Sequence, residues 1–263
     1  DDMVSRGLGD VYKRQLGRPA DAGRRPRSRL DAAASGRPAP ANLGLMPEGP
    51  EIRQEADRIA KALRGAVAED VWFAFPHLAD HASMLTGREV VAVESRGKAL
   101  LTRFEGGWNV YSHNQLYGRW YVVARGKEPQ TNRQLRFAVH TATRSALLYS
   151  ASEIEVLADE ELSEHPFLKK LGPDILSARV RPAAVRKRLR DPRFAGRSLG
   201  ALLLDQGFVC GLGNYLRSEI LFVSNLDADQ RPKDLDDDQV AALADAVVTL
   251  SLIHISEPTR HHV

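Results

Sequence analysis

The dipeptide Pro47-Glu48 has the clearest potential for covalent chemistry in this sequence. If the chain is processed behind Met46, Pro47 becomes the N-terminus and presents a secondary amine. An α-amino group has a pKa of about 8, so part of it is unprotonated at neutral pH and can attack an aldehyde-like carbon to form an iminium. Glu48 would then stand beside the nitrogen to donate or accept protons. The pair is also typical of a first helical turn, and taken alone it favours that plainer interpretation.

A lysine in an otherwise apolar segment is the second candidate. In SRGKALL, Lys98 lies between Gly97 and Ala99, within a stretch that alternates like a β-strand. A lysine there could contact a phosphate or move a proton. It could equally belong to a solvated strand face, and the segment alone favours that reading.

The third candidate is the glycine-spaced stretch LLLDQGFVCGLGNYLRSEIL, residues 202–221. One helix is expected to end near Gln206 and the next to begin at Asn214, which would cap it. Glycines before a helix N-terminus let backbone N–H groups approach an anion, and the helix dipole favours negative charge. This pattern is typical of a helix–turn–helix grip on a DNA backbone, but an ordinary helical corner fits as well. Arginines are frequent just upstream, at positions 179, 181, 186, 188, 190, 193 and 197.

These candidates need a scaffold, and apolar periodicity predicts one. A helix is expected from Ile52 to Leu63, followed by short strands from 71 to 149 with a hairpin turn at Gly106-Gly107. A helical piece is expected at 159–170, and Gly172-Pro173 forms a joint. Further helices are expected at 182–190, 198–205, 214–223 and 237–249. Strands first and helices afterwards predict an α+β protein with segregated domains and a boundary near 170–176.

Both ends of the chain look foreign to this scaffold. Residues 1–45 are rich in Arg, Ala, Gly and Pro, lack apolar periodicity and are expected to be a disordered, non-native leader. The strings DVYKRQ and SLIHISEPTR resemble translated sequencing-adapter text, so residues 250–263 are expected to be a non-native tail. The protein would then begin at Met46 and be cut off near residue 249.

Charge and composition bound the remaining possibilities. The net charge of +3 comes from the leader, which carries +4, whereas residues 46–249 carry −1. Global charge therefore does not argue for nucleic acid, and only local patches can. One cysteine, Cys210, excludes a disulfide framework and a thiolate-rich metal site within this chain. No apolar run appears long enough to cross a bilayer, so a cytoplasmic protein without a membrane partner is expected.

Taken together, the motifs resemble the formamidopyrimidine-DNA glycosylase/endonuclease VIII family of DNA repair enzymes. The resemblance covers residues 46–249 and is carried by the order of five segments: MPEGPEI, RGKALL, SHNQLYG, HPFLKKLGPD and GLGNYLRSEIL. MPEGPEIR and QLYG resemble the endonuclease VIII branch, which acts on oxidised pyrimidines, because the purine-specific branch usually opens with MPELPEV. The implied fold is a β-sandwich with a leading helix (46–172), followed by a helix–two-turn–helix domain (173–249).

The family also implies a role for each matching residue. Pro47 would be the nucleophile, and it must be the free N-terminus because an acylated nitrogen cannot form an iminium. Glu48 would assist sugar-ring opening, and Lys98 would be a proton donor and phosphate contact during β-elimination. A further set would bind DNA: the void-filling wedge Gln115, Leu116 and Tyr117, and the phosphate contacts Lys170 and Asn214. Without the resemblance, the wedge would read as a buried β-turn. His113, beside it, is expected to be structural.

The resemblance predicts a bifunctional glycosylase and abasic-site lyase that acts as a monomer on damaged double-stranded DNA in bacteria. Two alternatives remain: a glycosylase for oxidised purines (formamidopyrimidines), or a DNA-binding fragment without catalysis. The chain departs from the family at its end, where complete members carry a four-cysteine zinc finger. No zinc ligand matches here, so no metal or other cofactor is expected in this chain, with weaker DNA binding and impaired δ-elimination.

Overall fold

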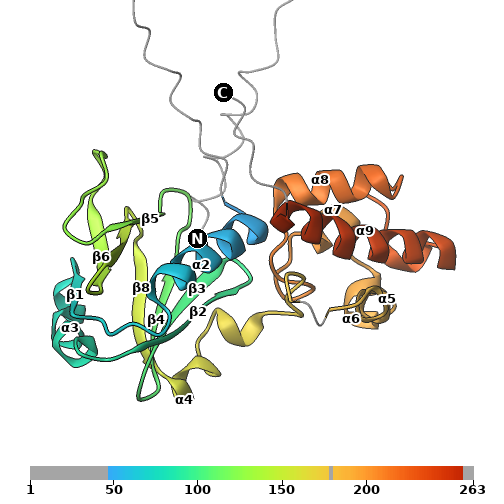
Figure 1. Ribbon diagram of the computed structural model, residues 1–263. Helices are drawn as coiled ribbons and strands as arrows, with labels where there is room; N and C mark the ends of the chain where they lie inside the picture. Colours follow the sequence, from blue (N-terminus) through green and yellow to red (C-terminus); the bar gives the residue numbers. More distant parts are fainter. Residues whose placement is uncertain (1–46, 178–179, 257–263) are drawn as a thin grey trace, which may run out of the picture. The chain divides into compact units, whose positions relative to one another are not determined.

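The structure, a computed structural model, describes residues 47–177 and 180–256, so the leader and residues 257–263 lie outside the described residues. The described residues all belong to one compact unit. Apart from a leading helix and one short helix after the first strand, its strands come first and its helices afterwards (Figure 1). The predicted α+β class is therefore confirmed, whereas the predictions that residues 1–45 and 250–263 are non-native stay predictions.

The first part is a two-layered antiparallel β-sandwich. One four-stranded sheet has the order β1-β6-β7-β5, and the other has the order β2-β3-β4-β8. The strands are β1 Asp70–Phe73, β2 Val90–Arg96, β3 Ala99–Phe104, β4 Trp108–His113, β5 Arg119–Ala124, β6 Leu135–His140, β7 Arg144–Tyr149 and β8 Glu153–Ala158. Between β4 and β5 the chain passes from one sheet to the other. The connecting loop, residues 114–118, therefore lies at an end of the sandwich.

Helix α2 (Gly49–Leu63) precedes the sandwich and shares its core. Ala56, Ile59 and Leu63 recur at helical spacing and are fully buried. They belong to the same cluster as residues of both sheets, such as Leu100 and Phe137. Burial of this apolar stripe fixes the helix on the sandwich, because each buried aliphatic side chain contributes roughly 1.5–3 kcal/mol. The residues just before the helix are thereby fixed too.

Further helices and 3-10 turns make up the other elements. They are α3 Ala79–Leu85, α4 Asp159–Leu162, α5 Pro182–Leu189, α6 Pro192–Ala195, α7 Leu199–Leu202, α8 Asn214–Val223 and α9 Asp237–Ser256, with 3-10 turns η1 Pro76–Leu78, η2 Leu168–Lys170 and η3 Pro232–Asp234. The helices from α5 onwards enclose their own apolar core, which includes Phe208, Leu216 and Leu243. The helical core and the sandwich core are separate clusters of buried residues. The domain boundary at the Gly172-Pro173 joint stays a prediction.

Helix α9 differs from its prediction in two ways. It continues to Ser256, seven residues beyond the expected end, and Ser251 is fully buried within it. It is also, within the described residues, the one helix long and apolar enough to span a membrane by length and composition alone. Its apolar residues Val240, Leu243 and Val247 are buried in the helical core, which accounts for its composition.

Candidate functional site

Glu48 lies at the junction between the β-sandwich and the helices. Its side chain is only 4% exposed. The carboxylate accepts hydrogen bonds from the backbone N–H of Tyr215 (2.9 Å to Oε1) and of Leu216 (3.4 Å to Oε2), both in the first turn of α8. An acidic group at this position is stabilised by the unpaired N–H groups and by the helix dipole. Glu48 thus fills the anion site that the glycine-spaced turn predicts.

The expected capping role of Asn214 is therefore corrected. The N-cap of α8 is Gly213, no side chain caps the helix from that position, and Asn214 is its exposed first residue. The glycines serve close packing instead of a loop open to solvent. A Cβ atom on Gly213 would collide with the Glu48 side chain, and one on Gly49 would stand 2.6 Å from the carbonyl oxygen of Gly211. Gly49 N–H also donates to that oxygen at 2.8 Å.

Glu51 is a second acidic residue of the site, and the sequence interpretation missed it. Its Oε2 accepts from the backbone N–H of Glu48 at 3.0 Å, and its Oε1 accepts from the hydroxyl of Tyr215 at 2.8 Å. The spacing from Glu48 to Glu51 is that of a capping box, with a glutamate at the third helical position, and this signal could have been read. Glu51 therefore fixes both Glu48 and Tyr215.

Lys98 brings a positive charge to these carboxylates. It lies in the turn between β2 and β3, not within a strand as expected, and it is half-buried. Burial lowers the pKa of Lys98, and the charges of Glu48 and Glu51 partly offset this effect. Burial likewise raises the pKa of Glu48. The hydrogen bonds from Tyr215 and Leu216 and the charge of Lys98 lower it, but by less. Both groups are moved toward their neutral forms, as proton transfer near neutral pH requires.

The turn that carries Lys98 is fixed by the segment after the joint. Gly97 has a φ of +59°, and its N–H donates to Asp174 Oδ2 at 3.0 Å. A Cβ atom on Gly97 would stand 3.1 Å from the Cβ of Cys210. The contacts of Gly97 with Asp174 and Cys210 thus fix the position of Lys98.

Pro47 directly precedes Glu48 and is half-buried. Its nitrogen is an amide in the full chain, since Met46 is bonded to it. Of the predicted catalytic residues, the structure therefore brings Glu48 and Lys98 near enough for their charges to influence each other, and Pro47 adjoins Glu48 along the chain.

The wedge loop, Asn114–Gly118, connects β4 to β5. Leu116 is 45% exposed and Tyr117 is 66% exposed, so the loop is not the buried turn that its residues alone suggest. Its base is pinned by Glu55 of α2, which accepts from Asn114 Nδ2 at 2.7 Å and from the Trp120 backbone N–H at 3.2 Å. The loop therefore presents an apolar tip on a fixed base.

Lys170 lies apart from this cluster. It ends η2, is exposed and lines a cavity of about 400 Å³ together with Phe167, Asp205 and Gln206. No described contact joins it to Glu48 or Lys98. The structure therefore leaves the predicted phosphate contacts Lys170 and Asn214 at exposed positions.

The described residues do not fit a zinc ion. Cys210 is buried against the Gly97 turn, and burial raises the pKa of its thiol to about 12, whereas zinc binds the thiolate. Within residues 47–177 and 180–256, no group of three or more His, Cys, Asp or Glu side chains is arranged to hold a metal.

Comparisons with known proteins agree with this architecture. The Formamidopyrimidine-DNA glycosylase N-terminal domain matches residues 46–152, and the Formamidopyrimidine-DNA glycosylase H2TH domain matches residues 171–255. The protein named Endonuclease 8 from Escherichia coli O17:K52:H18 is 52% identical over 83% of this chain and 82% of its own length. The Salmonella enteritidis PT4 protein of the same name is 49% identical over 82% of this chain and 84% of its own.

Solved structures show the same fold at lower identity. A complex of the LlFpg protein with THF-DNA and an inhibitor has a TM-score of 0.68 at 18% identity, and covers 80% of this chain and 79% of its own. A complex of Lactococcus lactis Fpg with DNA containing an abasic site has a TM-score of 0.67 at 19% identity, covering 79% of this chain and 78% of its own.

Proposed function

Because this chain belongs to the formamidopyrimidine-DNA glycosylase/endonuclease VIII family, whose members are DNA glycosylases and abasic-site lyases of base excision repair, we propose that it removes oxidised pyrimidines through a Schiff base on Pro47. The observation that carries the proposal is the buried Glu48 carboxylate beside Pro47, held by the first turn of α8, with Lys98 near enough for its charge to act on that carboxylate. The relatives named Endonuclease 8, at about 50% identity, support the choice of lesion class.

The chemistry begins once Pro47 is the free N-terminus. Its secondary amine attacks C1′ of the damaged nucleotide, the glycosidic bond breaks and the base leaves with a proton. Glu48 assists opening of the sugar ring, which leaves an iminium between Pro47 and C1′. The iminium acidifies the C2′ proton, so its loss expels the 3′ phosphate in β-elimination, and water then releases Pro47.

The electrostatics of the pair suit these proton transfers. A carboxyl group with a raised pKa holds its proton closer to neutral pH, and a lysine with a lowered pKa gives one up more readily. Lys98 would serve as the proton donor during elimination and as a contact to the departing phosphate. The first turn of α8 holds the Glu48 carboxylate in place while this happens.

DNA must also be opened and held. A nucleotide inside the stack cannot be reached, and flipping it out costs a few kcal/mol. The exposed Leu116 and Tyr117 are suited to fill the void, because apolar and aromatic side chains replace a lost stacking partner. Lys170 and Asn214, both exposed, would contact phosphates, which position the duplex without reading its sequence. The protein would act as a monomer on the bacterial chromosome.

Borohydride trapping on a duplex with a single abasic site tests the nucleophile. Two forms are compared: the full chain, and a form that begins at Met46, from which removal of the methionine exposes Pro47. Leu43–Val263 is a compact unit, so the shorter form keeps the described fold. We expect a covalent adduct with the shorter form alone. An adduct with the unprocessed chain would mean that another amine, such as Lys98, attacks.

Lesion choice needs a separate assay. The Met46 form is incubated with duplexes that each carry one oxidised pyrimidine or one formamidopyrimidine at the same position. We expect the oxidised pyrimidines to be released faster. Faster release of formamidopyrimidine would assign the chain to purine repair, and binding without trapping or release would identify a DNA-binding protein without catalysis.

A further inference from the structure

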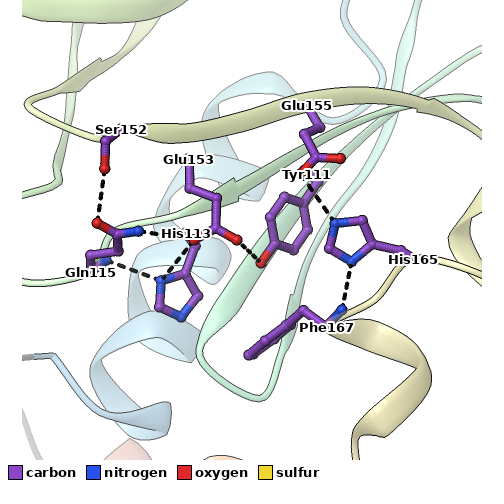
Figure 2. Close-up of polar contacts among 8 residues, drawn as sticks. All are labelled: Tyr111, His113, Gln115, Ser152, Glu153, Glu155, His165 and Phe167. Carbon is purple, nitrogen blue, oxygen red and sulfur yellow. Dashed lines mark hydrogen bonds and ion pairs between the residues drawn. The ribbon is translucent and has the colours of Figure 1, made fainter. Parts of the chain in front are cut away.

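The support of the wedge loop contains a carboxylate that none of the steps above uses. Gln115 has a φ of +50°, a left-handed backbone conformation that side-chain-bearing residues rarely adopt. Its amide oxygen accepts from Ser152 Oγ at 2.8 Å, and its Nε2 donates to Glu153 Oε2 at 3.0 Å. Its backbone N–H donates to His113 Nδ1 at 3.2 Å. Figure 2 shows these contacts converging on Gln115 from β4 and from the start of β8.

Glu153 is itself fixed by a buried partner. Its Oε1 accepts from the hydroxyl of Tyr111 at 3.1 Å, so both carboxylate oxygens are engaged (Figure 2). Tyr111 is fully buried, and burial raises its pKa, which keeps the hydroxyl protonated and able to donate. Its ring packs against those of His165 (4.4 Å between centroids) and Phe167 (6.2 Å). Glu153 is thus held by a buried tyrosine that is itself closely packed.

A histidine of β4 also faces this carboxylate. His113 Nδ1 lies 4.0 Å from Glu153 Oε2. Burial lowers the pKa of His113, the charge of Glu153 partly offsets this effect, and the charge of Lys98 adds to it. A neutral imidazole is able to accept the Gln115 N–H, which agrees with the observed hydrogen bond. The structural role predicted for His113 is consistent with this contact.

The wedge loop therefore divides into a residue whose side chain is anchored and a tip whose two side chains are exposed. Gln115 is exposed too, but its amide group is hydrogen-bonded to Ser152 and Glu153. Leu116 and Tyr117 are exposed, and the backbone carbonyl of Tyr117 accepts from Arg133 Nη1 at 2.6 Å. We propose that Glu153 is a positioning residue of the repair reaction, which fixes Gln115 and so holds the Leu116–Tyr117 tip ready to enter the duplex. A loop that is ordered beforehand loses less conformational freedom when it inserts. This inference rests on the proposed void-filling role of that tip.

The test compares two substrates that differ only in the need for a wedge. One is a duplex with a single abasic site, and the other is the same damaged strand without its complement, in which no void has to be filled. With Glu153→Ala in the Met46 form, we expect kcat/KM on the duplex to fall about tenfold, equivalent to about 1.4 kcal/mol. Activity on the single strand should stay within about twofold of the unsubstituted protein.

Two further variants calibrate the result. Glu153→Gln keeps one carbonyl acceptor and should fall between the alanine variant and the unsubstituted protein on the duplex. Glu155→Ala is the matched control, because Glu155 lies on the same face of β8 but pairs with His165 at 3.4 Å instead of Gln115. It should change neither activity, and melting temperatures are recorded for every variant.

A double variant of Leu116→Ala and Tyr117→Ala separates the inference from its premise. Two outcomes would show that Glu153 is not a positioning residue. In the first, the double variant loses activity on the duplex but Glu153→Ala does not. In the second, Glu153→Ala loses activity equally on both substrates. If the double variant treats duplex and single strand alike, the void-filling role itself has failed, and the inference falls with it.

Discussion

The carboxylate of Glu48 occupies the space that any side chain at Gly213 would need, although 165 positions separate the two residues. The same carboxylate accepts the N–H of Tyr215 at 2.9 Å. The absence of a side chain at Gly213 is thus what lets an acid from the start of the β-sandwich domain cap a helix of the other domain.

Gly213→Ala should therefore abolish most of the activity. The added Cβ displaces Glu48, and a misplacement of about 1 Å in a catalytic group can cost about 100-fold in rate. Single-turnover cleavage of an abasic duplex measures the loss. Gly196→Ala is the control, since nothing lies within 4 Å of a Cβ built there. Full activity of Gly213→Ala would show that the position of Glu48 is not critical.

Glu48→Gln should change the dependence of stability on pH. Burial raises the pKa of Glu48, so the folded protein binds this proton more tightly than the unfolded chain does. The contribution of Glu48 to the free energy of unfolding therefore falls as pH rises from the ordinary carboxyl pKa through the raised one, and is level above it. Urea unfolding of both proteins between pH 4 and pH 8 isolates this contribution. Glu55 is present in both proteins, so its own effect on stability cancels when the two are compared.

The same variant should lose about 100-fold or more in base release, as expected for a general acid–base group. A Glu48→Gln protein with unchanged activity would remove Glu48 from the mechanism. An identical pH dependence of the two unfolding curves would instead contradict the raised pKa.

The proposed site was only partly visible in the sequence. The pairing of Pro47 with Glu48 and the glycine spacing before Asn214 are local patterns, and the structure brings these two segments together. The contact from Glu48 to Tyr215 spans the whole fold, so no periodicity encodes it, and Asn214 was consequently given a capping role that Glu48 fulfils. Local alternation placed Lys98 in a strand, because a tight turn whose first residue is a glycine interrupts that pattern only briefly.

The same contrast holds for the fold. Strand and helix order followed from hydrophobic periodicity, because burial on one face imposes it. The end of α9 did not follow from periodicity, because the adapter-like composition after residue 249 gives no reason to extend the helix to Ser256. Exposure of Leu116 and Tyr117 also depends on tertiary packing, through the carboxylate of Glu55 beneath the loop.

Lys98→Met should impair elimination more than binding. The pKa of Lys98 is lowered mainly by burial, so the folded protein releases this proton more readily than the unfolded chain. The contribution of Lys98 to stability accordingly rises with pH from the lowered pKa up to the ordinary lysine value, and Lys98→Met removes that rise. We expect lyase turnover on an abasic duplex to fall about 100-fold.

Binding provides the control for Lys98. The slope of log affinity against log salt should change by at most about 0.9, the value of one phosphate contact. Lys127→Met, at an exposed position after β5, should leave turnover unchanged. A large loss of affinity with normal turnover of the bound complex would make Lys98 a binding residue alone.

Tyr117→Ala should leave stability unchanged but weaken base flipping. Its side chain is 66% exposed, and substitutions at such positions usually shift the free energy of unfolding by less than about 0.5 kcal/mol. Base–aromatic stacking contributes about 1–3 kcal/mol, so duplex cleavage should fall about tenfold. A fluorescent base opposite the damaged site reports insertion directly. Phe222→Ala, at another exposed aromatic residue, should alter neither quantity.

Cys210 should be inert in the folded protein. Burial raises its pKa to about 12, so almost no thiolate is present at pH 8. Iodoacetamide should modify it only after unfolding, as mass spectrometry can follow, and a chelator should leave the melting temperature unchanged. Rapid alkylation of the native protein would contradict its burial, and stoichiometric zinc in the purified protein would contradict the prediction that this chain binds none.

The capping of α8 by Glu48 also bears on the order in which the site forms during folding. A nascent chain acquires its proline long before it has made α8, and until then the carboxylate is solvated and has no helix dipole to hold it. The oriented acid therefore exists only after the segment before α2 has packed against the first turn of α8. The arrangement of this carboxylate is thus a late product of folding, present only once both segments have been made and brought together.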